Sequence, residues 1–329
     1  MNVRKKSIWP VILNHAGLLV VTVCMAFGSG DFQQLYMTVY EGTTQYQAID
    51  GKGSIVEPGF SIELHDFSVE YYPGNSPKRF ASHISVNTKD NHVVEEILEV
   101  NKPVKVDGWS IYQYGYNTLM LVRDPWLPGV YFGFFLLLAG AIAMLCTLDF
   151  KISGTRGVLL FSGILLLTAV FLYYFTPVFK TGHPAPALQS PWFSPHVIVY
   201  MLSYALLAAA TLLALLHKEN LTDNLIRAGV AFFTIGMLCG AFWAKQAWGH
   251  YWTWDPKETW AAITWGCYLL YIHLRKAGLR NWKLACAILV SAFLCLQMCW
   301  WGINYLPSQR SRSIHTYNYE YYSYLAVNK

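Results

Sequence analysis

The chain has 329 residues, of which 54% are hydrophobic and only 13% are charged, and its mean hydropathy is +0.30. This composition is typical of an integral membrane protein and excludes an ordinary soluble domain. The formal net charge is only +5. Because the basic residues form no stripe outside the flanks of the apolar runs, a nucleic-acid partner is also excluded.

Several apolar runs are long enough to cross a bilayer, which takes on the order of 20 helical residues. The seven runs lie at about 8–28, 127–148, 157–176, 196–217, 225–245, 259–275 and 282–303. The first run follows a basic start and could be misread as a signal peptide. It is longer than a usual signal core and carries His15, so we interpret it as a retained anchor.

The placement of lysine and arginine predicts the orientation of these runs. Arg4 precedes the first run. Other basic residues, such as Lys218 and Arg275, occupy every second connection between the runs. With seven spans, these groups all fall on one side, and the positive side is the cytoplasm. We therefore expect a multi-pass protein of the cytoplasmic (inner) membrane with a cytoplasmic N-terminus. The polar stretch 29–125, the tryptophan-rich stretch 243–265 and the C-terminus are then on the outer side.

The polar stretch 29–125 is the candidate for an exported domain. Within 59–72, Phe60, Ile62 and Leu64 share one face, and the alternation continues after a shift. Further strand-like segments lie at 82–88, 93–100 and 109–116. Short strands with Gly, Pro and Asn turns predict a small antiparallel β-sandwich or barrel. All seven cysteines lie in the apolar runs, so this domain has no disulfide framework.

The segment from Trp243 to Trp265 is the most specific feature of the sequence. It holds six of the 13 tryptophans, with Asp255, Lys257 and Glu258 among them. Tryptophan gathers at membrane interfaces for generic reasons, so an aromatic belt is the alternative interpretation. A belt does not require the fixed string Trp-x-Trp-Asp-Pro-Lys-Glu, whereas indole faces suit a large flat ligand. We therefore predict a ligand platform.

The histidines fall at two depths once the topology is set. His15 and His273 lie in the inner half of the bilayer and can meet there, and His196 and His315 can meet outside, beside the tryptophans. Imidazole binds haem iron well, so two pairs at two depths suit an iron cofactor that moves outward. Intramembrane histidines can also simply hydrogen-bond a neighbouring helix. Two other outward histidines could compete as ligands: His183 and His250.

These residues resemble the system II cytochrome c biogenesis proteins. The string Asp255-Pro-Lys-Glu-Thr-Trp260 resembles the tryptophan-rich haem-handling motif of CcsA (ResC). Pro195-His196-Val197 and Tyr271-Ile-His273 resemble the segments that carry that family's first external and its intramembrane histidine, and the tail with His315 resembles the segment of its second external histidine.

The front of the chain resembles CcsB (ResB), through Asn14-His15-Ala-Gly17 and through Asn101-Lys-Pro103 followed by Gly108-Trp109-Ser-Ile-Tyr112. The resemblance implies a short CcsB–CcsA (ResB–ResC) fusion. Its expected parts are a transmembrane anchor (1–28), an extracytoplasmic β domain (29–125) and a CcsA-like haem-handling domain (126–329). Fused relatives have further spans before a larger exported domain, so a further CcsB-like chain could supply them.

The resemblance implies haem export across the membrane and covalent attachment of haem to apocytochrome c, the reaction of a holocytochrome c synthase (haem lyase). Haem b would be both substrate and ligand, and a thioredoxin-like thiol reductant would be a second partner besides the apocytochrome. The alternative is a non-catalytic haem transporter or delivery module whose synthase activity lies in a partner. No side chain is expected to act as a nucleophile, because the protein orients groups that react by themselves.

The same resemblance implies roles for individual residues. His15 and His273 would ligate the iron at the inner site, and His196 and His315 at the outer site. Five residues would surround the ring: Trp248, Trp252, Trp254, Asp255 and Trp260. Three basic residues could pair with the haem propionates: Lys257, Arg310 and Arg312. Asp255 and Glu258 could instead brace the loop by pairing with Lys257, and bracing is the role we expect for Glu258.

Overall fold

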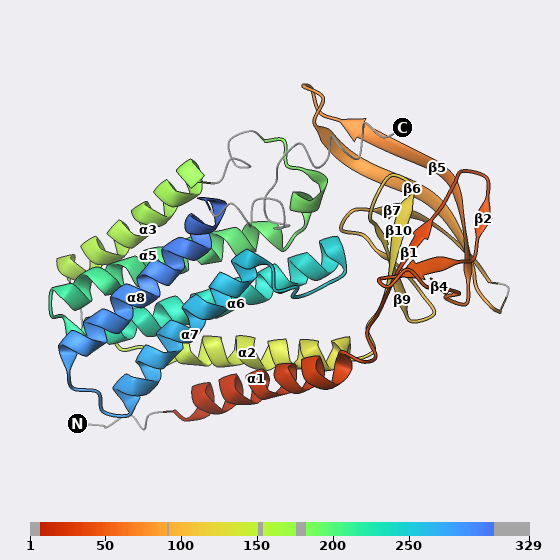
Figure 1. Ribbon diagram of the computed structural model, residues 1–329. Helices are drawn as coiled ribbons and strands as arrows, with labels where there is room; N and C mark the ends of the chain where they lie inside the picture. The colour runs from red at the N-terminus through yellow and green to blue at the C-terminus, as the bar shows by residue number, and fades with distance from the viewer. Residues whose placement is uncertain (1–6, 91, 151–153, 176–181, 306–329) are drawn as a thin grey trace.

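The computed structural model describes residues 7–90, 92–150, 154–175 and 182–305. Within these residues the chain forms seven α-helices, with a β domain between the first two (Figure 1). The helices are α1 (Trp9–Gly28), α2 (Leu127–Cys146), α3 (Thr155–Phe175), α5 (Phe193–Leu215), α6 (Glu219–Trp248), α7 (Pro256–Lys276) and α8 (Trp282–Trp300), and the short 3₁₀ turns are η1 (Pro186–Gln189) and η2 (Gly302–Tyr305).

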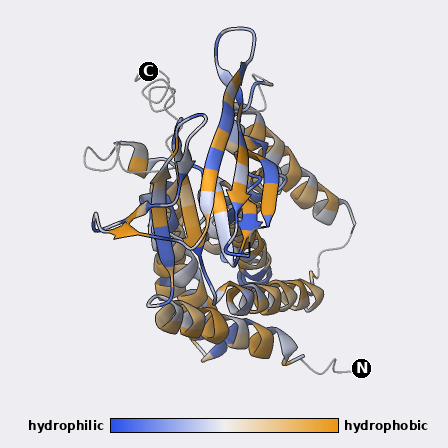
Figure 2. Ribbon diagram, turned by 90° about the vertical axis from the view of Figure 1, so that its right-hand side faces the viewer, coloured by the Kyte–Doolittle hydropathy of each residue, from blue (hydrophilic) through white to orange (hydrophobic). Residues whose placement is uncertain are grey.

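The helices confirm a polytopic membrane protein. Among the described residues, α1, α2, α5, α6 and α8 are long and apolar enough to cross a bilayer. In α3 only the stretch 157–170 qualifies as apolar, and α7 does not qualify. The reason for α7 is that its first and last turns are charged and its middle is rich in aromatic and small residues. Figure 2 shows the contrast between the mostly hydrophobic helices and the strands, which alternate in hydropathy.

The β domain consists of two sheets whose strands pair antiparallel. One sheet has the order β4-β3-β1-β10-β9-β8 and the other β2-β5-β6-β7. The strands are β1 (Gln33–Thr38), β2 (Thr44–Gln45), β3 (Ala48–Asp50), β4 (Ile55–Val56), β5 (Ser61–Tyr71), β6 (Pro77–Asn87), β7 (Val93–Glu99), β8 (Val104–Val106), β9 (Trp109–Gln113) and β10 (Thr118–Arg123). Both sheets contribute to one buried core, as in the predicted sandwich.

The structure explains which strands were visible in the sequence. The shift in the alternation of 59–72 is a register irregularity of β5 between Leu64 and Asp66. Strand β10 has no alternation because it is buried on both faces: Leu119 and Leu121 face the sandwich core, and Met120 and Val122 belong to a second apolar cluster. A short strand covered on both faces lacks the period-two signal, so it was missed.

The β domain lies against the end of the helical bundle at which α6 ends (Figure 1). Gly249, directly after α6, has φ +74° and lies so close to β10 that a Cβ there would meet Met120 at 2.8 Å and Val122 at 3.0 Å. On the other side, the buried Asn101 donates from Nδ2 to the Pro186 carbonyl at 2.7 Å. The tryptophan-rich loop therefore begins on the surface of the β domain.

Candidate functional site

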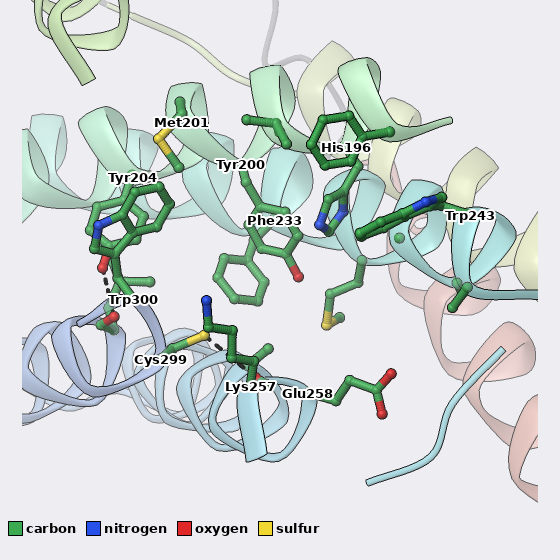
Figure 3. A pocket seen from close by; sticks show the side chains of 18 of the residues that line it. His196, Tyr200, Met201, Tyr204, Phe233, Trp243, Lys257, Glu258, Cys299 and Trp300 are labelled. Carbon is green, nitrogen blue, oxygen red and sulfur yellow. Dashed lines mark hydrogen bonds between the residues drawn. The ribbon is translucent and has the colours of Figure 1, made fainter. Parts of the chain in front are cut away.

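A cavity of about 500 Å³ opens among α5, α6, α7 and α8, next to the tryptophan-rich loop (Figure 3). Its walls are mainly aromatic and apolar, as in most sites for flat organic ligands. The aromatic residues of the described wall come from α5, α6, the loop that precedes α7, α8 and the residues just after α8: Phe193, Tyr200, Tyr204, Phe233, Trp243, Tyr251, Trp252, Trp300, Trp301 and Tyr305.

His196 is the one histidine among the described residues of this wall, and its imidazole turns into the cavity (Figure 3). Its Nδ1 lies 2.8 Å from the Gly236 carbonyl oxygen, which can only accept, so Nδ1 carries the proton and donates. In this tautomer the lone pair lies on Nε2, the arrangement usual for metal-bound histidine. A Cβ on Gly240 would lie 2.7 Å from the imidazole, so the missing side chain lets the ring lie over α6.

The tryptophans of the motif divide between the cavity and its surroundings. Trp243 and Trp252 line the cavity. Trp243 is buried and donates from Nε1 to the Ala187 carbonyl at 2.8 Å, and its ring centroid lies 4.9 Å from that of Trp248. Trp254 has φ +58° and is 65% exposed, with its ring edge-on to Trp252. The described cavity lining does not include three of the predicted ring contacts, Trp248, Trp254 and Trp260. Their role stays a prediction.

Asp255 is the buried N-cap of α7. Its Oδ1 accepts from the Lys257 amide at 2.8 Å, and the Glu258 carboxylate accepts from the amides of Asp255 and Thr253 at 3.1 Å and 2.8 Å. This reciprocal arrangement is a capping box. We expected these two carboxylates to brace the loop by pairing with Lys257, whereas the described hydrogen bonds brace it through backbone amides, and Asp255 does not line the described cavity.

His15 in α1 and His273 in α7 lie side by side, with ring centroids 5.9 Å apart. Each Nδ1 hydrogen-bonds the carbonyl four residues earlier in its helix, of Val11 at 2.8 Å and of Leu269 at 2.7 Å. Both therefore donate from Nδ1 and present Nε2. If two imidazoles bind one iron from opposite sides, metal–nitrogen bonds of about 2 Å place the two ring centroids about 6 Å apart. The distance fits shared ligation, which itself remains a prediction.

The other predicted residues lie elsewhere. Three of them are outside the described residues: His315, Arg310 and Arg312. His183 stacks on Tyr72 with ring centroids 4.5 Å apart. His250 packs against Phe32 of the β domain with ring centroids 5.5 Å apart. Burial lowers the pKa of His250, and the nearby Lys245 charge lowers it further. Neither histidine is in the described wall of the cavity.

Sequence reasoning missed Tyr200 and Tyr204, which line the cavity on the same helix as His196. A signal for them exists, because positions 196, 200 and 204 are spaced by four and share one helical face. It also missed Cys299, Trp300 and Trp301 at the end of α8. Their proximity to α7 depends on helix packing, so no local pattern could reveal it.

Comparison with known proteins gives two family matches in chain order. Residues 7–122 match the ResB-like family, and residues 128–309 match the family described as Cytochrome C assembly protein.

Among individual relatives, the chain is similar to the cytochrome c biogenesis protein CcsA of Chlamydomonas reinhardtii, with 38% identity over 156 residues that cover 41% of this chain and 42% of that protein. It is also similar to the CcsA proteins of Agrostis stolonifera (35% identity, 37% of this chain and 55% of that protein) and Zea mays (36% identity, 37% and 56%). The chain thus spans about half the length of the curated relatives it matches.

Proposed function

The chain belongs to the Cytochrome C assembly protein family, preceded by a ResB-like part, and from this premise we propose that it exports haem and attaches it covalently to apocytochrome c. The family match confirms the predicted ResB–CcsA relationship and a role in cytochrome c biogenesis. Haem transport, the synthase reaction and the partners belong to the proposal.

The observation that carries the proposal is the aromatic cavity with His196 in its wall. A planar porphyrin needs flat apolar walls and an axial nitrogen for its iron. The cavity offers indole and phenol rings from α5, α6, α8 and the loop that precedes α7, and the Nδ1–H of His196 is held by the Gly236 carbonyl, which puts the lone pair on Nε2. His315 is the proposed second ligand of the outer site.

Transport is supported by the second histidine pair. His15 and His273 are close together on α1 and α7, toward the end of α7 that lies away from the tryptophan-rich loop. Haem enters between them from the cytoplasmic side and reaches the His196 cavity on the outer side. A non-covalent passage from one bis-histidine site to the other requires no chemistry from the protein, only ligands at two depths.

The attachment step is an addition. Each cysteine thiol of the apocytochrome adds across one vinyl group, so that sulfur bonds to one vinyl carbon and hydrogen to the other, with no net oxidation or reduction. This chain contributes orientation: His196 holds the iron, the aromatic walls exclude water, and the capping box of Asp255 and Glu258 sets the loop at the cavity. The apocytochrome thiols must be reduced, which is the task of a thioredoxin-like partner. A further CcsB-like chain is the third proposed partner.

The test is to co-express the full chain with one apocytochrome c in a host that lacks its own maturation system. We expect covalent haem in the cytochrome, seen as haem stain that survives denaturing electrophoresis. His196→Ala should abolish it, and imidazole in the medium should partly restore it by filling the vacant iron position. His183→Ala, which alters an outward histidine outside the described cavity wall, is the matched control.

Two results would change the conclusion. A chain that binds haem and delivers it but yields no covalent product is a transporter whose synthase lies in a partner. A chain that supports maturation but never carries haem, even with apocytochrome bound, would refute the proposal.

A further inference from the structure

The side chain of Lys257 points into the aromatic cavity (Figure 3). Among the residues that the structure describes, its Nζ makes neither a hydrogen bond nor an ion pair; only its backbone atoms do. The charge of Asp255 acts on it, but that carboxylate is occupied as the cap of α7. A cation enclosed by apolar walls is unfavourable unless an anion joins it.

A second donor faces the same space. The hydroxyl of Tyr200, from α5, turns into the cavity and has no hydrogen-bond partner among the described residues (Figure 3). Its ring is held edge-on between His196 at 4.8 Å and Phe233 at 4.9 Å, so the position of the hydroxyl is fixed by packing. The Tyr200 hydroxyl and the Lys257 ammonium thus come from facing helices, α5 and α7.

Three other polar groups of the cavity wall already have partners. The Tyr204 hydroxyl donates to the Leu296 carbonyl at 2.6 Å, and the Cys299 thiol lies 3.5 Å from the Lys257 carbonyl. The Glu258 carboxylate accepts from backbone amides and points away from Lys257 (Figure 3). Against this background, Lys257 Nζ and Tyr200 OH are two donors that a ligand can use.

We propose that Lys257 and Tyr200 form a carboxylate subsite within the cavity, which selects flat apolar ligands that carry a carboxylate. A carboxylate accepts charge-assisted hydrogen bonds from an ammonium and a hydroxyl, and its arrival neutralises the enclosed cation. This inference rests on the proposed function for the identity of the ligand: the carboxylate is a haem propionate, while His196 holds the iron. It orients the porphyrin, since only one edge of haem carries propionates.

The experiment compares three probes bound by the purified full chain: haem, haem dimethyl ester, which lacks free carboxylates, and protoporphyrin IX, which lacks iron. Lys257→Met should weaken haem and protoporphyrin binding about tenfold or more, because hydrogen bonds to charged groups are lost. It should leave the affinity for the dimethyl ester unchanged. Tyr200→Phe should act in the same direction by a smaller factor.

Two matched variants serve as controls. Lys257→Arg retains the charge and should keep most of the discrimination between haem and its ester. Tyr204→Phe removes a hydroxyl from the same wall, but one that already donates to Leu296, so it should not discriminate between the probes.

The outcomes distinguish a failure of the carboxylate subsite from a failure of the proposed function. If Lys257→Met binds haem as tightly as the parent, or loses haem and ester equally, the carboxylate subsite is wrong while haem binding stands. If the parent binds protoporphyrin through Lys257 but never ligates iron, the subsite stands and the proposed function fails. A parent chain that binds none of the three probes overturns both.

Discussion

Lys245 Nζ lies 3.2 Å from Asp124 Oδ2, and the two side chains are only 7% and 8% exposed. Asp124 directly follows β10, and Lys245 is in the last turn of α6, just before the tryptophan-rich loop. The ring of Tyr251 lies 6.0 Å from the same ammonium. This ion pair therefore fastens the β domain to the helix from which the loop emerges.

Removing one partner of this pair should loosen the docking of the β domain. Asp124→Ala leaves the Lys245 ammonium buried without its partner, and such a loss costs about 3–5 kcal/mol. We expect a lower thermal midpoint and faster proteolysis near the junction between β10 and α2. The double variant Asp124→Leu, Lys245→Met, which removes both charges, should recover most of the stability. Equal damage in the single and double variants would show that the charge pairing is not the cause.

Substitutions at Asp255 can distinguish its role as the cap of α7 from a role of its carboxylate in haem binding. Asp255→Ala should destabilise the first turn of α7 by about 1 kcal/mol and increase hydrogen exchange at the Lys257 and Thr259 amides. Asp255→Asn retains a capping oxygen and should keep that protection. If the Asn variant remains protected yet loses haem, the carboxylate itself has a task beyond capping.

The inner histidines should act before the outer site. His15→Ala and His273→Ala should each reduce the haem found at the outer site about tenfold or more, because losing either ligand breaks the same bis-histidine arrangement. The two variants should resemble each other, and haem supplied from outside should bypass both. Reduced-minus-oxidised absorption spectra of the purified protein measure the occupancy. Full occupancy in the double variant would refute transport through this pair.

The β domain should lose stability in acid through Glu99. The Arg79 guanidinium, hydrogen-bonded to Glu99, holds the pKa of that carboxyl below its usual value, and Lys102 adds to the effect. A depressed folded-state pKa means that the stabilisation is present above the unfolded pKa and is lost as the pH falls through the folded pKa. Glu99→Gln should cost about 1–2 kcal/mol at pH 7 and nothing at acid pH. Thermal unfolding between about pH 7 and pH 3 measures both, and a cost independent of pH would contradict the assignment.

Much of the fold could be predicted from local patterns. Composition and the length of the apolar runs predicted the membrane-spanning helices, because crossing a bilayer requires a long apolar segment whatever its neighbours are. Period-two alternation located β5, and the strand-like segments at 82–88, 93–100 and 109–116 located β6, β7 and β9. Counting residues along the helices predicted that His15 and His273 can meet, and the structure brings their ring centroids to 5.9 Å.

The site depended on contacts that no local pattern contains. Trp252 lines the cavity whereas Trp254, two residues on, is 65% exposed, because the backbone turns through a positive φ at Trp254. Asp124 and Lys245 are 121 residues apart, and their pairing exists only because the β domain docks on α6. The sequence by itself determined the long apolar helices and the strands with one buried face, since those follow from hydropathy and periodicity. The tertiary structure alone decided which side chains share one cavity, since that depends on the faces that packed helices present to each other.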